Sequence, residues 1–161
     1  MQKDTSFKKA CVEKYFNMVF KLALAQTKNK EYAEDVCQDV FLKFLNSGKE
    51  FETEEHIKAW LIRVTINTAK SVFLSSWFKK TVPLNEDEST SFDVDEKNDV
   101  LSAVGELPLK YRTVIHLFYY EDMSVSEIAK ALNVPENTIK SQLLRARGIL
   151  KEKLKGEMDF V

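Results

Sequence analysis

Apolar residues recur every three or four positions along much of the chain, the spacing that puts them on one side of an α-helix. Between residues 6 and 28 this stripe comprises Val12, Tyr15, Phe16, Val19, Phe20, Ala23 and Leu24. No stretch keeps the strict alternation of a half-buried strand. The pattern therefore predicts an all-α chain, with helices over residues 6–28, 30–45, 53–78, 98–106 and 109–120 and a final pair over residues 124–132 and 136–154.

The final pair has the features of a helix-turn-helix. Ser124 followed by Glu127 predicts a capping box, in which the serine hydroxyl accepts a backbone N–H and the glutamate side chain returns the bond. Asn133 tolerates the left-handed conformation that ends a helix, and Pro135 cannot continue one. Ala129 is small enough for two helices to cross closely over a short turn.

The second helix of this pair has two dissimilar sides. One side carries Ile139, Leu143, Ala146 and Leu150 and predicts the buried face. The other side is polar and basic, with Asn137, Lys140, Ser141, Leu144, Arg145 and Lys151. Six Lys or Arg stand against two acids between residues 136 and 156, which favours DNA binding over a plain bundle element.

The helix over residues 30–45 also has an unusual outer face. Its predicted core positions are Ala33, Val36, Cys37, Val40 and Phe44. The opposite face carries Asp35, Gln38, Asp39 and Leu42, with Glu31 and Glu34 at its flank. A solvated surface is the simpler interpretation, but an apolar side chain among carboxylates is better suited to docking on a basic helix.

The third helix is predicted to start at Thr53, a favourable N-cap followed by two acids where the helix dipole stabilises them. Trp60 is expected at the inner edge of the core, although an exposed indole can also stack on a base. Asn67 interrupts the apolar pattern, so it is either exposed or bound by a partner.

Charge is distributed unevenly although the formal net charge is only -1. Residues 1–80 carry 14 basic and 10 acidic side chains, residues 81–99 carry 1 and 7, and residues 100–161 carry 9 and 8. The middle stretch has a proline and no periodicity, which is typical of a flexible linker. We therefore predict two small helical domains, 1–80 and 100–161, joined by an acidic flexible linker over 81–99.

Few features indicate an enzyme, a metal site or a membrane protein. Cys11 and Cys37 lack metal-ligand spacing, His56 and His116 are isolated in sequence, and four glycines form no phosphate-binding loop. No apolar run approaches the ~18 residues of a membrane span, and no signal-peptide core begins the chain. We expect a cytoplasmic protein with reduced thiols, no membrane insertion, no catalytic residues, no cofactor and no metal.

Three segments, in order, resemble one family. These are AEDVCQDVF at 33–41, AWLIRVTIN at 59–67, and the segment from LPLKYRTVIHLFYY to SQLLRAR at 107–147. Together they resemble a bacterial RNA polymerase sigma factor of the extracytoplasmic-function type, in which only the second and fourth conserved regions remain. The resemblance covers roughly residues 7–80 and 100–155, and the spacing of the segments agrees with it.

The resemblance implies a role in transcription initiation, with core RNA polymerase and promoter DNA as partners and an anti-sigma factor as a regulator. The first segment corresponds to the polymerase contact, which implies that role for Glu34, Asp35, Gln38, Asp39 and Leu42. The second corresponds to the promoter-melting helix and implies contacts to the melted element for Trp60, Arg63, Asn67 and Lys70. The third implies contacts to the upstream element for Asn137, Thr138, Lys140, Ser141, Leu144, Arg145, Arg147 and Lys151.

Two departures from the family affect the DNA contacts. The family usually follows the melting helix with arginines, whereas residues 71–78 are uncharged. In the recognition helix the family commonly has Gly and Arg where Asn137 and Gln142 stand. We predict that Asn137 reads adenine and Leu144 touches a thymine methyl, while Arg147 and Lys151 contact phosphates.

Two other functions remain open at this point. A stand-alone helix-turn-helix regulator would use the same basic helix, and its N-terminal helices would only dimerise or bind a protein. A polymerase-binding module without initiation activity would fit the low basic content after Lys70. The acidic helix and the 59–67 segment favour the sigma factor, since neither has a role in a simple repressor.

Overall fold

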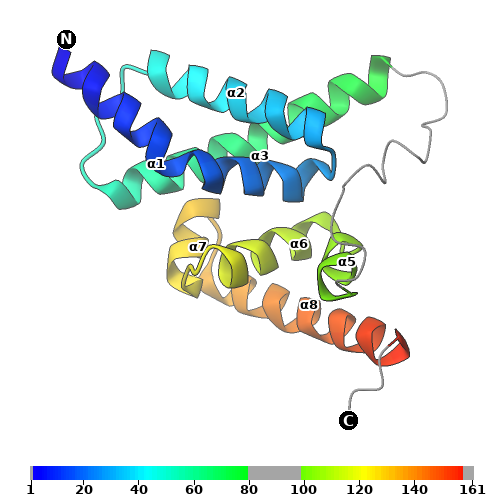
Figure 1. Ribbon diagram of the computed structural model, residues 1–161. Helices are drawn as coiled ribbons and strands as arrows, with labels where there is room; N and C mark the ends of the chain where they lie inside the picture. The colour runs from blue at the N-terminus through cyan, green and yellow to red at the C-terminus, as the bar shows by residue number, and fades with distance from the viewer. Residues whose placement is uncertain (1, 80–98, 158–161) are drawn as a thin grey trace.

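A computed structural model describes residues 2–79 and 99–157. Every regular element in these two ranges is helical, which confirms the predicted all-α class (Figure 1). The elements are α1 (Gln2–Thr27), α2 (Lys30–Asn46), α3 (Glu54–Lys79), α5 (Asp99–Gly105), α6 (Leu109–Ile115), η1 (His116–Tyr120), α7 (Val125–Leu132) and α8 (Glu136–Glu157). The predicted linker, apart from Asp99, lies outside the described residues.

Helices α1, α2 and α3 pack together as an N-terminal bundle. Its interior consists of aliphatic and aromatic side chains with almost no exposed surface, including Val19, Leu22, Val36, Val40, Phe44 and Leu61. All five predicted core positions of α2 are buried. The 3.6-residue period thus identified the inner face of this helix correctly.

Local capping explains where α2 and α3 begin. The Asn29 side chain accepts a hydrogen bond from the Tyr32 N–H at 2.9 Å. The Thr53 hydroxyl accepts one from the His56 N–H at 3.1 Å, as expected of an N-cap. Each bond satisfies a backbone donor that has no partner within its own helix, so both starts are determined locally.

The C-terminal group comprises α5, α6, α7 and α8. The predicted capping box is present, because the Ser124 Oγ accepts from the Glu127 N–H at 3.1 Å and the Ser124 N–H donates to the Glu127 carboxylate at 2.8 Å. Asn133 adopts the left-handed conformation with φ 59°. Ile139, Leu143 and Ala146 of α8 are buried against the rest of the group.

The predicted single helix over residues 109–120 differs from the structure. It is α-helical only to Ile115 and continues as the π-helical turn η1. The wider turn closes with a hydrogen bond from the Glu121 N–H to the His116 carbonyl at 3.1 Å. It leaves His116 and Leu117 buried while Tyr119 and Tyr120 are exposed.

The two helical groups pack on each other. Figure 1 shows α1–α3 as one layer and α5–α8 as the other, with α1 facing α6 and α3 facing α7. The Gln26 side chain donates a buried hydrogen bond of 2.7 Å to the Thr113 hydroxyl across this junction. The sequence pattern predicted both groups but not their contact.

Candidate nucleic-acid interface

The outer face of α8 is open to solvent. Asn137, Lys140, Ser141 and Arg145 are exposed, and Leu144 is the most exposed large apolar side chain described, at 69%. Thr138 is half-buried. The structure therefore brings together, on one face, the side chains predicted to read the upstream element. Their mix of amide, hydroxyl, methyl and cationic groups matches the edges that bases present in the major groove.

A hollow of about 300 Å³ lies beside this face and is shared with α6. Lys110 and Tyr111 form one wall, and the α8 residues Asn137, Ser141 and Arg145 line the other. The Lys110 ammonium lies 5.1 Å from the Tyr111 ring centroid. Lys110 was not predicted from sequence, although a lysine just after Pro108 at a helix start could have drawn attention to it.

Arg147 is oriented by aromatic residues of η1. Its Nε donates a 2.7 Å hydrogen bond to the Tyr119 hydroxyl, and its guanidinium lies 5.6 Å and 5.7 Å from the Phe118 and Tyr119 ring centroids. The side chain is nevertheless exposed, as is Lys151 one turn further along α8. Both cations therefore remain available to phosphate oxygens.

The four residues assigned to promoter melting have different surroundings on α3. Asn67 and Lys70 are exposed. Trp60 is half-buried, with its ring 5.8 Å from both Phe44 and Phe51, so most of the indole belongs to the core edge. The Arg63 side chain is exposed, and it donates hydrogen bonds to the carbonyls of Ala131 at 3.2 Å and Lys130 at 3.5 Å.

The outer face of α2 borders a groove of about 730 Å³ shared with α1. Glu34, Asp35 and Gln38 are exposed at its rim, and Leu42 is 52% exposed. Asp39 lies outside the groove lining and forms an ion pair with Lys43 at 3.2 Å. The groove is otherwise apolar, lined by Val12, Phe16, Phe20, Cys37, Phe41 and Leu45.

Phe16 is the main difference from the predicted pattern at this groove. The periodicity placed it in the buried stripe of α1, yet it is 47% exposed and stacks on Phe20 and Phe41 with centroid distances of 6.3 Å and 6.1 Å. The apolar stripe of α1 is wider than its neighbouring helices cover. An exposed aromatic row beside carboxylates is therefore part of the surface.

Burial raises the pKa of the Cys37 thiol to about 11, and it also raises the pKa of Cys11. Both thiols are therefore protonated near neutral pH and poorly nucleophilic. Within residues 2–79 and 99–157, no cluster of three His, Cys, Asp or Glu residues could hold a metal ion. None of the helices in these ranges is long and apolar enough to span a bilayer.

Comparison with known proteins identifies the family. Residues 11–78 match the model for Sigma-70 region 2, and residues 97–150 match the model for Sigma-70, region 4. RNA polymerase sigma factor SigV of Bacillus subtilis is 30% identical over 153 residues, which cover 91% of this chain and 90% of that protein. The chain belongs to the sigma-70 family, as a sigma factor of the extracytoplasmic-function type. As a sigma factor it directs transcription initiation, and a stand-alone regulator is not favoured.

Other relatives agree with this identification. The extracytoplasmic-function sigma factor SigM of Bacillus subtilis is 29% identical, over 85% of this chain and 88% of its own. Among solved structures, the sigma factor RpoE in complex with the anti-sigma factor NepR from Bartonella quintana superposes with a TM-score of 0.73 and 23% identity. That match covers 94% of this chain and 98% of that one. At 23% identity the structural match supports the fold and nothing further.

Proposed function

We propose that this sigma factor divides its contacts among three surfaces. The α1–α2 groove and its acidic rim bind core RNA polymerase, the outer face of α8 reads the upstream promoter element, and α3 engages the melted element. The corresponding domains are residues 1–80 and 100–161, with residues 81–99 as the acidic linker. The observation that carries the proposal is the solvent-open α1–α2 groove, in which Leu42 and Phe16 are about half exposed.

The groove has the composition of a docking surface for a basic helix. A partner that covers exposed Leu42 and Phe16 is bound more tightly, because burial stabilises the complex by about 25 cal/mol for each Å² of apolar area. Glu34 and Asp35 at the rim attract cationic side chains and steer the encounter. Asp39 does not line the groove, and its ion pair with Lys43 partly neutralises its charge. We therefore propose that it contributes less to polymerase binding than Glu34 and Asp35.

Upstream recognition rests on the exposed side chains of α8. Asn137 has an amide that can pair with the adenine edge, and Leu144 can contact a thymine methyl. Thr138, Lys140, Ser141 and Arg145 complete this face. Arg147, Lys151 and Lys110 surround it with positive charge and are suited to phosphate contacts, which determine affinity and register rather than sequence.

Promoter melting is assigned to α3. Asn67 and Lys70 are exposed and can meet an unstacked base or a phosphate directly. Trp60 offers only the outer part of its ring, so its contribution is a stacking edge. Arg63 can join them once its guanidinium releases the Ala131 and Lys130 carbonyls of α7.

The first experiment replaces Leu42 by Asp and measures binding of the full chain to core RNA polymerase. We expect affinity to fall by about tenfold or more, because a charge would enter an apolar contact. Leu74→Asp is the matched control, since Leu74 is 54% exposed on α3 outside the groove. Equal affinity of the Leu42→Asp variant and the unchanged chain would refute the docking assignment.

The second experiment is transcription in vitro with core polymerase on sheared genomic DNA from the source organism, with and without this chain. We expect new RNA 5′ ends that share two spaced upstream motifs. Co-elution with polymerase without new starts would indicate a binding module without initiation activity. Tight duplex binding by the free chain, without polymerase, would indicate a stand-alone regulator.

Three further properties belong to the proposal. We expect the protein to act in the cytoplasm, where its polymerase is, and to have no catalytic activity of its own. We also expect an anti-sigma factor as a regulator. Support comes from the neighbours RpoE and CnrH, which were solved with the anti-sigma factor NepR and with the cytosolic domain of CnrY. CnrH superposes with a TM-score of 0.69 at 19% identity.

A further inference from the structure

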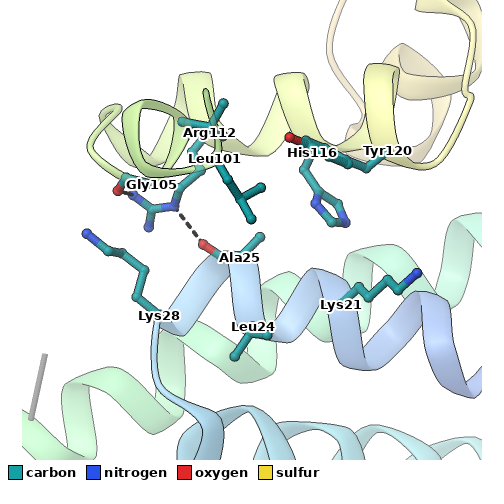
Figure 2. A pocket seen from close by; sticks show the side chains of 10 residues that line it. Lys21, Leu24, Ala25, Lys28, Leu101, Gly105, Arg112, His116 and Tyr120 are labelled. Carbon is teal, nitrogen blue, oxygen red and sulfur yellow. Dashed lines mark hydrogen bonds between the residues drawn. The ribbon is translucent and has the colours of Figure 1, made fainter. Parts of the chain in front are cut away.

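A cavity of about 310 Å³ lies between the two helical groups. One wall belongs to α1 and the other to α5, α6 and η1 (Figure 2). None of the surfaces assigned to polymerase or DNA above includes it. Because residues about ninety positions apart in sequence form it, the cavity exists only when the two groups are in contact.

The middle of the cavity is apolar. Leu24 and Ala25 of α1 line one side, and Leu101 and Val104 of α5 line the other. Figure 2 shows the Leu101 side chain pointing toward Ala25. Gly105 also lines the cavity, and a Cβ added at Gly105 would have no heavy atom within 4 Å. A small volume with largely apolar walls and a few polar groups is typical of a small-molecule site.

One end of the cavity has an excess of positive charge. Figure 2 shows Lys28 and Arg112 together at this end. Burial lowers the pKa of Lys28, and the Arg112 charge lowers it further, while Glu106 opposes them. The Glu106 carboxylate is already paired with Lys153 at 2.9 Å, and within the described ranges no carboxylate lies within ion-pair distance of the Lys28 ammonium. A ligand anion would supply the missing counter-charge.

The opposite end is less favourable for an anion. His116 lines it and is 8% exposed, with its Nε2 lying 3.3 Å from a Glu121 carboxylate oxygen without hydrogen-bond geometry. Lys21 lies at the exposed rim of this end. Water screens the Lys21 charge at this rim, and the Glu121 carboxylate beside His116 adds negative charge behind the lining. An elongated ligand is therefore oriented with its anionic group toward Lys28 and Arg112.

We propose that this cavity binds a small amphiphilic carboxylate of the medium-chain fatty-acid class, with its carboxylate at Lys28 and its alkyl chain between the α1 wall at Ala25 and the α5 wall at Leu101. Arg112 contributes its charge but few free donors, since its N–H groups already meet four backbone carbonyls. Lys28 therefore supplies the direct ion pair, and the walls supply the hydrophobic contribution.

Such a ligand stabilises the contact between the two helical groups, because it touches both and would lose its contacts with one of them if they separated. In this closed arrangement Arg63 is held by α7. The ligand should therefore oppose promoter opening. This consequence rests on the proposed function of α3, whereas binding itself does not.

The test is calorimetric titration of octanoate into the full chain, with octylamine and octanol at equal concentration as charge controls. We expect one octanoate per chain and no binding of octylamine. Lys28→Gly removes the ammonium at a residue with φ 57°, where glycine is well tolerated, and should weaken octanoate by about tenfold. Gly105→Leu should fill the cavity and abolish binding.

Lys30→Ala is the matched control, because Lys30 is an exposed neighbour that does not line the cavity. Undiminished binding to either Lys28→Gly or Gly105→Leu, equal binding of octylamine, or no saturable binding of octanoate would each overturn the proposal. A separate transcription assay distinguishes the two ideas. If octanoate binds as expected but leaves initiation unchanged, only the regulatory consequence is refuted. If the chain fails to support initiation even in the absence of octanoate, the proposed function is refuted instead.

Discussion

The Arg112 guanidinium donates to the Ala25 and Gln26 carbonyls at 2.6 Å and 3.3 Å, and to those of Gly105 and Leu107 at 3.4 Å and 2.8 Å. The first two belong to the last turn of α1, where unpaired carbonyls carry the negative end of the helix dipole. A cation there joins two parts of the chain and stabilises both helix ends. At the scale of single residues, Arg112 joins the two groups through two of its four hydrogen bonds.

Replacing Arg112 by Met keeps most of the apolar stem but removes every donor. We expect the free energy of unfolding to fall by about 2–3 kcal/mol, since a charged donor serving several carbonyls is lost. Urea denaturation followed by circular dichroism measures this change. Arg112→Lys keeps the charge but not the planar guanidinium, so its free energy of unfolding should lie between those of the unchanged chain and Arg112→Met. An unchanged midpoint for Arg112→Met would contradict the role assigned to it.

Single residues of α8 should separate into two classes in holoenzyme binding. Lys151→Ala should lower the slope of log affinity against log salt by about 0.9, the effect of one phosphate contact, for every promoter alike. Asn137→Ala should change the preferred base at one upstream position and leave that slope unchanged. Competition binding at several salt concentrations measures both, and identical behaviour of the two variants would refute the division.

At the scale of elements, the helix-turn-helix is determined by its own caps. Ser124 and Glu127 satisfy each other's backbone donors, and Asn133 takes the left-handed conformation that lets the Val134 N–H reach the Ala129 carbonyl at 3.0 Å. These bonds lie within ten residues. The presentation of α8 to DNA therefore depends first on local chemistry.

This cap has a pH dependence of known sign. The hydrogen bond from the Ser124 N–H lowers the pKa of the Glu127 carboxyl below its ordinary 4.5. A carboxyl whose pKa is lower in the folded than in the unfolded protein stabilises the fold at pH values above its unfolded-state pKa. This stabilisation is lost as the pH falls through its folded-state pKa. The difference in unfolding free energy between the unchanged chain and Glu127→Ala should therefore narrow below about pH 4.5.

The measurement is chemical denaturation of both proteins at a series of pH values. We expect Ser124→Ala to lower the free energy of unfolding by about 1 kcal/mol near neutral pH, which is the usual effect of removing an N-cap side chain. A Glu127→Ala difference that stays constant into the acid range would show that the carboxylate charge contributes nothing to the cap.

At the scale of the whole molecule, α1 and α3 of one group contact α6 and α7 of the other. Two arginines and the buried Gln26–Thr113 pair provide polar contacts at this junction. In this arrangement Arg63 donates to two carbonyls of α7. On the proposed function, we expect the two groups to separate when α3 and α8 act on separate promoter elements.

The double variant Arg63→Ala, Arg112→Ala should open the molecule. A compact chain of this length has a radius of gyration of about 15 Å, and we expect small-angle scattering to give a value several ångströms larger for the variant. Lys153→Ala is a suitable control, since its ion pair with Glu106 lies within one group. An unchanged radius would indicate that apolar contacts alone hold the two groups together.

The amino-acid sequence by itself determined the helices, the capping box, the αL turn at Asn133 and the buried faces of α2 and α8. It also indicated the sigma family. Each of these depends on residues within a few turns of one another, so periodicity and side-chain chemistry suffice to predict them. The error at Phe16 arose because periodicity gives the direction of a side chain but not the width of the surface that covers it.

Only the tertiary structure decided which surfaces remain open. Arg112 reaches a carbonyl 87 residues away, Arg63 reaches one 68 residues away, and Lys110 joins the edge of the α8 face from another helix. Such contacts depend on the packing of separately formed helices, for which the chain carries no local signal. The aromatic groove beside Leu42 and the cavity at Lys28 follow from the same packing, which therefore decides what each side chain can bind.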